Sequence, residues 1–291
     1  MNTRLFFRLF FLTVAVLSAA ACQNEPTAAE GKVKASEAYL THFGGPPVPE
    51  KGQCYARVGF YPLKEAPEKV GAVPLFLFEE KNQLQLLLER LVSAEIDFPA
   101  RSPLFNPFPP GSSVRLASRA GDTAEVELIL KGSSKPENLS AMAAALTETV
   151  VQFEDIEQVR IVVNGTPLEE MPANGFAHDA GRIAPPGPPA LLLTVGTWED
   201  GALDPKEILA DFDRPVTIES FTLTDASGQK IKGDYFTSAF DMAVVIHPDN
   251  PSSLKEGMAL RAEWQVVDRL GRKGEGTGNF TLGRHDHDEG H

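Results

Sequence analysis

Residues 139–165 read LSAMAAALTETVVQFEDIEQVRIVVNG and decide the fold of the first half of the chain. The apolar side chains of its first part lie three or four positions apart: Leu139, Met142, Leu146, Val150 and Phe153. That spacing places them on one face of a helix. The apolar run 159–163 predicts a buried strand, which the turn residues Asn164 and Gly165 close. A helix that leads directly into a buried strand predicts an α+β domain.

The sequence before this stretch predicts two further strands and a second helix. Alternating apolar residues predict strands over 56–61 and 73–77. Pro74 favours an edge position for the second strand, because proline has no backbone N–H to donate. Helical spacing then predicts one buried face, with Asn82 placed to cap the first turn: Leu84, Leu87, Leu88, Leu91 and Val92.

A hairpin completes the first domain. The runs 114–118 and 124–130 flank Gly121 and Asp122, which favour a turn. We therefore expect residues 53–171 to form an α+β domain with a mixed sheet and two helices.

The order of these elements resembles the GerMN domain, a sporulation and germination module also found in many bacterial lipoproteins. The most specific marks are Pro109-Pro110-Gly111 before the hairpin and the final strand that ends in Asn164-Gly165. The resemblance covers residues 53–171. It implies a non-catalytic scaffold or recognition domain that faces the cell envelope.

The second half of the chain has the pattern of an all-β domain. Proline and glycine crowd residues 172–189, which predicts a semi-stiff linker. Short strand-like runs separated by turn residues then predict an immunoglobulin-like sandwich over 190–283: 191–195, 218–224, 230–236, 243–247, 259–267 and 279–282. The glycine-dense segment 271–278 is interpreted as a long hairpin loop.

Two motifs of this half resemble bacterial immunoglobulin-like domains of the copper-resistance-C type. They are Phe212-Asp213-Arg214-Pro215-Val216 and the stretch 264–268, which begins at Trp264. The resemblance implies a β-sandwich. Copper-binding members of that group have a ligand at their mature N-terminus, and no residue of this chain matches it. Copper binding is therefore not carried over.

The first 21 residues are typical of a signal peptide. Arg4 and Arg8 precede an uncharged apolar run over 9–21 that is too short to span a bilayer as a helix. The following Leu17-Ser18-Ala19-Ala20-Ala21-Cys22 resembles a bacterial lipobox. That resemblance implies that the Cys22 thiol receives diacylglycerol. Processing by the ordinary signal peptidase is the alternative, because Ala19 stands where the family usually has Leu.

The predicted anchor implies a location. Residues 22–52 are interpreted as a tether that joins a lipid-anchored Cys22 to the folded part. Gln23 follows the cysteine, where an Asp would resemble an inner-membrane retention signal. We therefore expect the bacterial cell envelope: the outer membrane, facing the periplasm, if the organism is Gram-negative, and otherwise the outer face of the cell membrane.

The composition of the chain argues against one class of binding partner, nucleic acid. The chain has 291 residues with 27 Lys and Arg against 40 Asp and Glu, a net charge of −13, and no basic cluster with interleaved aromatic residues. Such a surface repels phosphate, which argues against nucleic acid. With Cys22 acylated, Cys54 has no cysteine to pair with. Because free cysteine is among the most buried residue types, we expect Cys54 to lie in a core.

Candidate chemistry is sparse. The predicted tail 284–291 carries His285, His287 and His291 between carboxylates, and these imidazoles are weak candidates for a divalent metal. A solvated acidic tail is the favoured interpretation. His178-Asp179 has half of a general-base pair, but no nucleophile motif accompanies it. We therefore expect no catalytic residue, no enzymatic activity and no required cofactor.

Together these features predict a lipid-anchored, non-enzymatic envelope protein. It would act as a scaffold or binding module for an envelope protein complex or for the cell wall. The alternative is a lipoprotein that collects divalent metal through its histidine-rich tail.

Overall fold

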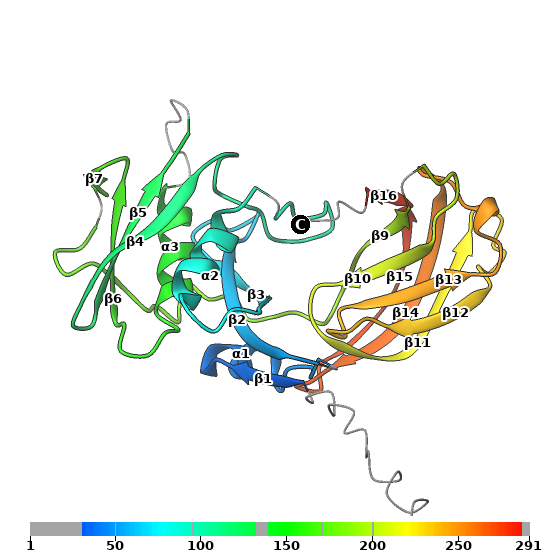
Figure 1. Ribbon diagram of the computed structural model, residues 1–291, viewed down its shortest axis with the longest axis horizontal. Helices are drawn as coiled ribbons and strands as arrows, with labels where there is room; N and C mark the ends of the chain where they lie inside the picture. Colours follow the sequence, from blue (N-terminus) through cyan, green and yellow to red (C-terminus); the bar gives the residue numbers. More distant parts are fainter. Residues whose placement is uncertain are drawn as a thin grey trace, which may run out of the picture. The chain divides into compact units, whose positions relative to one another are not determined.

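A computed structural model describes residues 31–49, 51–94, 96–131, 139–169, 171–199 and 201–286. The predicted signal peptide, Cys22, His287 and His291 lie outside these residues. The described elements form an α+β N-terminal lobe, followed by a C-terminal β-sandwich (Figure 1). This confirms the predicted fold class. No helix in the described part of the chain is both long and apolar enough to cross a membrane.

The N-terminal lobe opens with a three-stranded sheet in the order β1-β2-β3. Its strands are β1 (Lys32–Ala35), β2 (Gln53–Pro62) and β3 (Val70–Leu77). β1 runs parallel to β2, and β3 runs antiparallel to it. β3 lies at an edge, as Pro74 predicted. Cys54 of β2 is fully buried, as expected for a free cysteine.

Helix α1 (Glu37–Phe43) corrects one prediction, because it lies within the expected tether. Its N-cap is Ser36, whose Oγ accepts a hydrogen bond from the Tyr39 amide at 3.1 Å. Tyr39 and Phe43, four residues apart, pack against Phe60 of β2. Burying two rings stabilises this segment on the lobe, so the tether cannot extend beyond residue 30 as free chain.

A second sheet and two more helices complete the lobe. The elements are α2 (Gln83–Val92), β4 (Ser113–Ala120), β5 (Thr123–Ile129), α3 (Leu139–Val150), β6 (Gln158–Val163), β7 (Thr166–Pro167) and β8 (Phe176–Ala177). The strand order is β4-β5-β6-β7, and β8 also pairs with β6. The sheet is mixed as predicted, because β4 and β5 are antiparallel whereas β5 and β6 are parallel. The described residues of 53–171 contain the two predicted helices, α2 and α3, and α1 is an additional helix that precedes this range.

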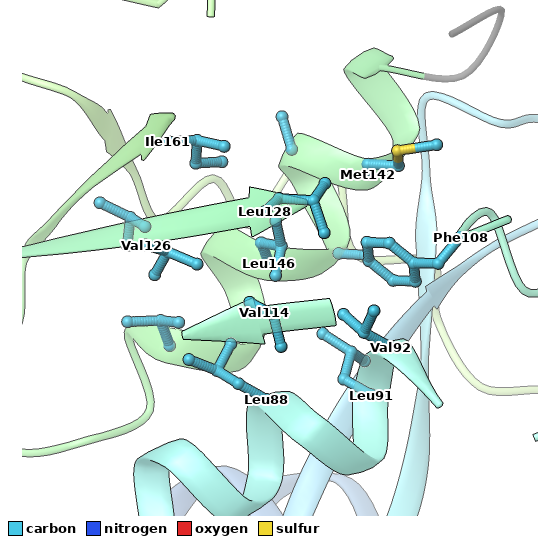
Figure 2. Packing of buried hydrophobic residues seen from close by; sticks show 14 of the residues in the cluster. Leu88, Leu91, Val92, Phe108, Val114, Val126, Leu128, Met142, Leu146 and Ile161 are labelled. Carbon is cyan, nitrogen blue, oxygen red and sulfur yellow. The ribbon is translucent and has the colours of Figure 1, made fainter. Parts of the chain in front are cut away.

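The predicted helix faces form the main core of this lobe. Figure 2 shows side chains of α2 and α3 meeting those of β4 and β5. Leu88 and Leu91 of α2 and Leu146 of α3 are fully buried. Asn82 does precede α2, but it adopts a left-handed conformation (φ 58°) and makes no side-chain capping bond. The buried stripe, rather than the cap, therefore stabilises α2.

The predicted linker is also more ordered than the sequence suggested. Its Phe176–Ala177 forms β8, and Ile183 forms a parallel bridge with Val70 of β3. The amide of Val70 donates to the carbonyl of Arg182 at 2.9 Å. Residues 176–184 therefore form a strap along the N-terminal lobe, and the free spacer is much shorter than 172–189.

The C-terminal sandwich consists of a five-stranded sheet, β12-β13-β10-β9-β16, and a three-stranded sheet, β11-β14-β15. Its elements are β9 (Leu191–Trp198), β10 (Glu207–Phe212), β11 (Val216–Asp225), β12 (Gly233–Thr237), β13 (Ala243–Pro248), the 3-10 turn η1 (Pro251–Ser253), β14 (Ala259–Asp268), β15 (Lys273–Thr281) and β16 (Gly283–Asp286). Alternate residues of β10 and β14 point into one core that includes Trp198 and Trp264.

The sandwich departs from the sequence analysis in two places. The glycine-dense segment is not a loop, because Lys273–Thr281 pairs with β14 along its whole length. The expected tail also begins later than residue 284, because Gly283–Asp286 forms β16, parallel to β9. Both segments are strands because each pairs with another strand. The local pattern of a glycine-rich or histidine-rich run does not indicate such pairing.

Gly276 explains how β15 packs so closely against Trp264 of β14. A Cβ atom added to Gly276 would lie 2.6 Å from Cζ2 of Trp264, whose side chain is buried in the sandwich core. We expect Gly276→Ala to lower the free energy of unfolding by about 1–3 kcal/mol, because the packed ring would have to shift to make room for the new methyl group. Urea unfolding would measure this. Gly45→Ala is the control, since nothing lies within 4 Å of its added Cβ; an equal loss in both variants would contradict the packing explanation.

Candidate functional site: a groove beside helix α1

A groove of about 830 Å³ lies on the N-terminal lobe, between α1, the C-terminal end of α3 and the strap. Its wall is largely apolar and includes Ala38, Phe60, Val151, Ile156 and Ile183. Each of the three segments is held by its own contacts: the capped helix α1, the buried helix α3 and the bridge to β3. The groove is therefore formed before any ligand arrives, which is typical of binding sites.

The strap is attached to α3 through one buried carboxylate. The side chain of Glu148 is 2% exposed, and its Oε1 accepts a hydrogen bond from the Asp179 amide at 3.0 Å. Its Oε2 lies 2.7 Å from Nδ1 of His178. Both oxygens are thus occupied within the protein. Glu148 holds the groove's far wall in place and has no free oxygen to act on a ligand.

Gln152 joins the remaining walls. Its Oε1 accepts from the Val58 amide at 3.0 Å and from the Ser36 hydroxyl at 3.2 Å. Its Nε2 donates to the carbonyl oxygens of Val58 at 2.6 Å and Thr149 at 2.7 Å. This one amide connects the cap of α1, the centre of β2 and the end of α3. It fixes the position of α1 relative to the groove floor.

His42 on α1 also lines the groove. Burial lowers the pKa of His42 below its ordinary value, since a desolvated imidazole disfavours the charged form. The imidazole is therefore neutral near pH 7. A neutral ring beside an apolar wall suits the binding of an uncharged or apolar segment.

The structure places the sequence-predicted residues differently. His178, considered as half of a general base, is instead bonded to Glu148 at the groove wall. His285 lies on β16 opposite Thr197 of β9, away from the groove's lining residues. No group of three or more metal-ligating side chains occurs among the residues that the structure describes.

Sequence reasoning missed Glu148, Gln152 and His42. One signal was present: Thr147, Glu148 and Thr149 are polar residues inside an otherwise apolar helix, and all three are buried. A charged residue on the buried part of a helix indicates a specific partner. The partners of Glu148 are His178 and Asp179, about thirty residues later in the chain, and only the path of the strap brings them to it.

Burial raises the pKa of the Cys54 thiol, so the reactive thiolate is disfavoured. Cys54 is fully buried in β2 and is not among the residues that line the groove. It is a core residue.

Comparison with known proteins gives matches to parts of the chain. No curated protein matches it. The tandem GerMN domains of the sporulation protein GerM from Bacillus subtilis match with 24% identity and a TM-score of 0.33, over 43% of this chain and 44% of that one. The first GerMN domain of GerM matches with 25% identity and a TM-score of 0.33, over 43% of this chain and 93% of that one.

A further solved structure is also similar to part of this chain. CopC from Methylosinus trichosporium OB3b matches with 16% identity and a TM-score of 0.24, over 33% of this chain and 95% of that one.

In the N-terminal lobe, the resemblance read from the sequence is confirmed, because residues 60–169 match the family described as Germane, sporulation and spore germination.

Proposed function

We propose that this protein is a lipid-anchored, non-enzymatic module of the bacterial cell envelope that binds a segment of another envelope protein in the groove beside α1. The observation that carries the proposal is the groove itself, about 830 Å³ of preformed space with a largely apolar wall. Its buried carboxylate is already engaged by the strap. A site of this kind favours binding over catalysis.

The expected ligand follows from the shape and charge of the groove. Pro185 and Pro186 line one side, and α1 lines the other, so an extended peptide fits better than a folded surface. Neutral His42 and the satisfied Glu148 add no free charge to the buried part of the wall. The other two lining carboxylates are exposed: Glu37 and Glu157. We therefore expect an apolar peptide segment with few charged residues.

Site-specific photo-crosslinking in intact cells tests this binding. A photoreactive amino acid at Thr41, which is exposed and lines the groove, should give an adduct with one defined protein. The same group at Leu40 is the matched control, since Leu40 is 47% exposed on the same helix but does not line the groove. Equal adducts at both positions would contradict groove binding.

A groove-filling variant provides the second arm. Ala184→Trp places a large ring among the lining residues. In this variant, the photoreactive group at position 41 should no longer form the adduct. Recovery of a cell-wall fragment instead of a protein adduct would reject the protein partner in favour of the wall. An unchanged adduct in the filled variant would reject the groove as the site.

The anchor needs its own test. Mass spectrometry of the mature N-terminal peptide should show a diacylglycerol adduct on Cys22, and Cys22→Ser should move the protein into the soluble fraction. Release of the intact wild-type protein by washing with high salt and no detergent would contradict the anchor, since acyl chains are not displaced by salt.

A further inference from the structure

A second hollow of the N-terminal lobe contains a positive charge without a carboxylate partner. This arginine pocket has a volume of about 1020 Å³ and lies between the β1–β2 pair, the start of α2 and residues 151–157. A ridge that includes Gln152 and Ile156 borders both this pocket and the groove. The arginine pocket is more polar than the groove, and Arg57 of β2 is among its lining residues.

The Arg57 guanidinium is held by neutral groups. Its central carbon lies 5.7 Å from the ring centroid of Tyr55 and 5.8 Å from that of Phe153. Nη1 donates to the carbonyl oxygens of Ala56 at 3.2 Å and Lys34 at 3.4 Å, and Nη2 donates to Oε1 of Gln83. In the described ranges, no carboxylate lies within 4 Å of it.

The groups around Arg57 leave its positive charge without a compensating negative charge. Burial lowers the pKa of Arg57, because desolvation disfavours the charged form. Nε is buried and has no hydrogen-bond partner in the described residues. A partly buried guanidinium is ordinarily paired with a carboxylate or phosphate, whose charge compensates the lost hydration. Here the two rings and three neutral acceptors fix the guanidinium in place but do not neutralise it.

The start of α2 adds to the positive potential. This ten-residue helix has no acidic residue in its first turn, and Asn82 makes no side-chain capping bond. Unsatisfied first-turn amides and the helix dipole favour an anion at this end. Asn82 and Gln83 line the same pocket as Arg57. Two independent features therefore favour negative charge in one cavity.

The acidic residues of the pocket limit how much negative charge a ligand can carry. Its five lining carboxylates are all exposed: Glu37, Glu80, Glu154, Asp155 and Glu157. Glu80 lies 4.0 Å from Lys34, and Asp155 lies 3.9 Å from Arg119. These carboxylates are solvated and stand at the rim. A rim of negative charge repels a polyanion, whereas a single carboxylate can pass it and reach the floor.

We propose that the arginine pocket binds one carboxylate group of a ligand through the Arg57 guanidinium, with Gln83 and the start of α2 as supporting donors. The planar guanidinium matches a carboxylate through parallel hydrogen bonds. Two sources present this chemistry: an acidic side chain of a protein, and a sugar acid of the cell wall. The proposal is independent of what occupies the groove.

Titration of the full chain tests the proposal. The probes are a blocked dipeptide with one glutamate, N-acetylmuramic acid and inorganic phosphate, followed by calorimetry and by the arginine Nε–H NMR signals. We expect saturable binding of at least one carboxylate probe, a shift of the Arg57 signal, and at least tenfold weaker binding of phosphate. The stronger of the two carboxylate probes identifies the source.

Variants decide whether Arg57 is responsible. Arg57→Gln should weaken binding of the preferred carboxylate at least tenfold, and Arg57→Lys should give an intermediate affinity, because it keeps the charge but loses the planar fork. Arg115→Gln is the control, since Arg115 is exposed, paired with Glu127 and outside the pocket. If Arg57→Gln does not fold, the Arg57 signal of the unmodified chain still decides. An Arg57 signal that does not shift would overturn the proposal. Phosphate bound as tightly as the carboxylate probes would also overturn it, because the pocket would then hold an adventitious ion only.

Discussion

Replacing Asp268 with alanine should lower the free energy of unfolding by about 3–5 kcal/mol, because it breaks a buried ion pair with Arg272 and leaves two backbone amides without their acceptor. The Asp268 side chain is 1% exposed, and its Oδ2 accepts from Nε of Arg272 at 2.5 Å. Nη1 of Arg214, a side chain only 8% exposed, lies 3.7 Å from the same oxygen. Oδ1 accepts from the amides of Leu270 at 3.0 Å and Arg272 at 2.9 Å.

Urea unfolding of two further variants separates the charge from the hydrogen bonds. Asp268→Asn keeps an acceptor for the two amides, so its loss should be smaller than that of alanine but still above about 1 kcal/mol. Glu263→Ala removes an exposed partner of Arg261 at 3.6 Å, and should change stability by no more than about 0.5 kcal/mol. Equal losses in Asp268→Ala and Glu263→Ala would contradict the buried network.

The second large effect is a dependence of stability on pH that originates in Asp211. This residue of β10 alternates with Ala210 and Phe212, which point into the core, and its carboxylate has no hydrogen-bond partner among the described residues. Burial raises the pKa of Asp211 from 3.8 to about 6, opposed by the nearby His285. The folded chain therefore holds a proton on Asp211 between pH 4 and pH 6 that the unfolded chain has already released.

The sign of the effect follows from this linkage. The contribution of Asp211 to stability is complete below pH 3.8 and is lost as the pH rises through about 6. A shift of about two pH units corresponds to up to roughly 3 kcal/mol. Asp211→Asn cannot ionise, so it should match the wild type near pH 4 and exceed its stability by up to that amount at pH 7. A stability difference that does not change between pH 4 and pH 7 would contradict the raised pKa.

Local patterns predicted the secondary structure best where a segment carries its own signal. The apolar stripe of α2, the hairpin of β4 and β5, and the Asn164-Gly165 turn after β6 all occur as expected. Pro74 correctly indicated an edge strand. In each case, the spacing of neighbouring residues or one backbone preference decides the outcome.

The errors have one physical cause. β15 is a strand although three of its nine residues are glycine, because it pairs with β14 and Gly276 leaves room for Trp264 of that strand. Helix α1 folds onto the lobe although it lies in the predicted tether, because Tyr39 and Phe43 find a surface on β2. Both outcomes depend on partners distant in the chain, and no local pattern specifies them.

The sequence by itself determined the two-part α+β and all-β architecture and the resemblance that the family match confirms for residues 60–169. Only the tertiary structure decided the candidate sites. It brought His178 to Glu148 and formed the groove, and it surrounded Arg57 with neutral partners in the arginine pocket. Periodicity indicates which side chains face a core, but hydrogen bonding and desolvation of polar groups depend on the surfaces that distant segments bring together.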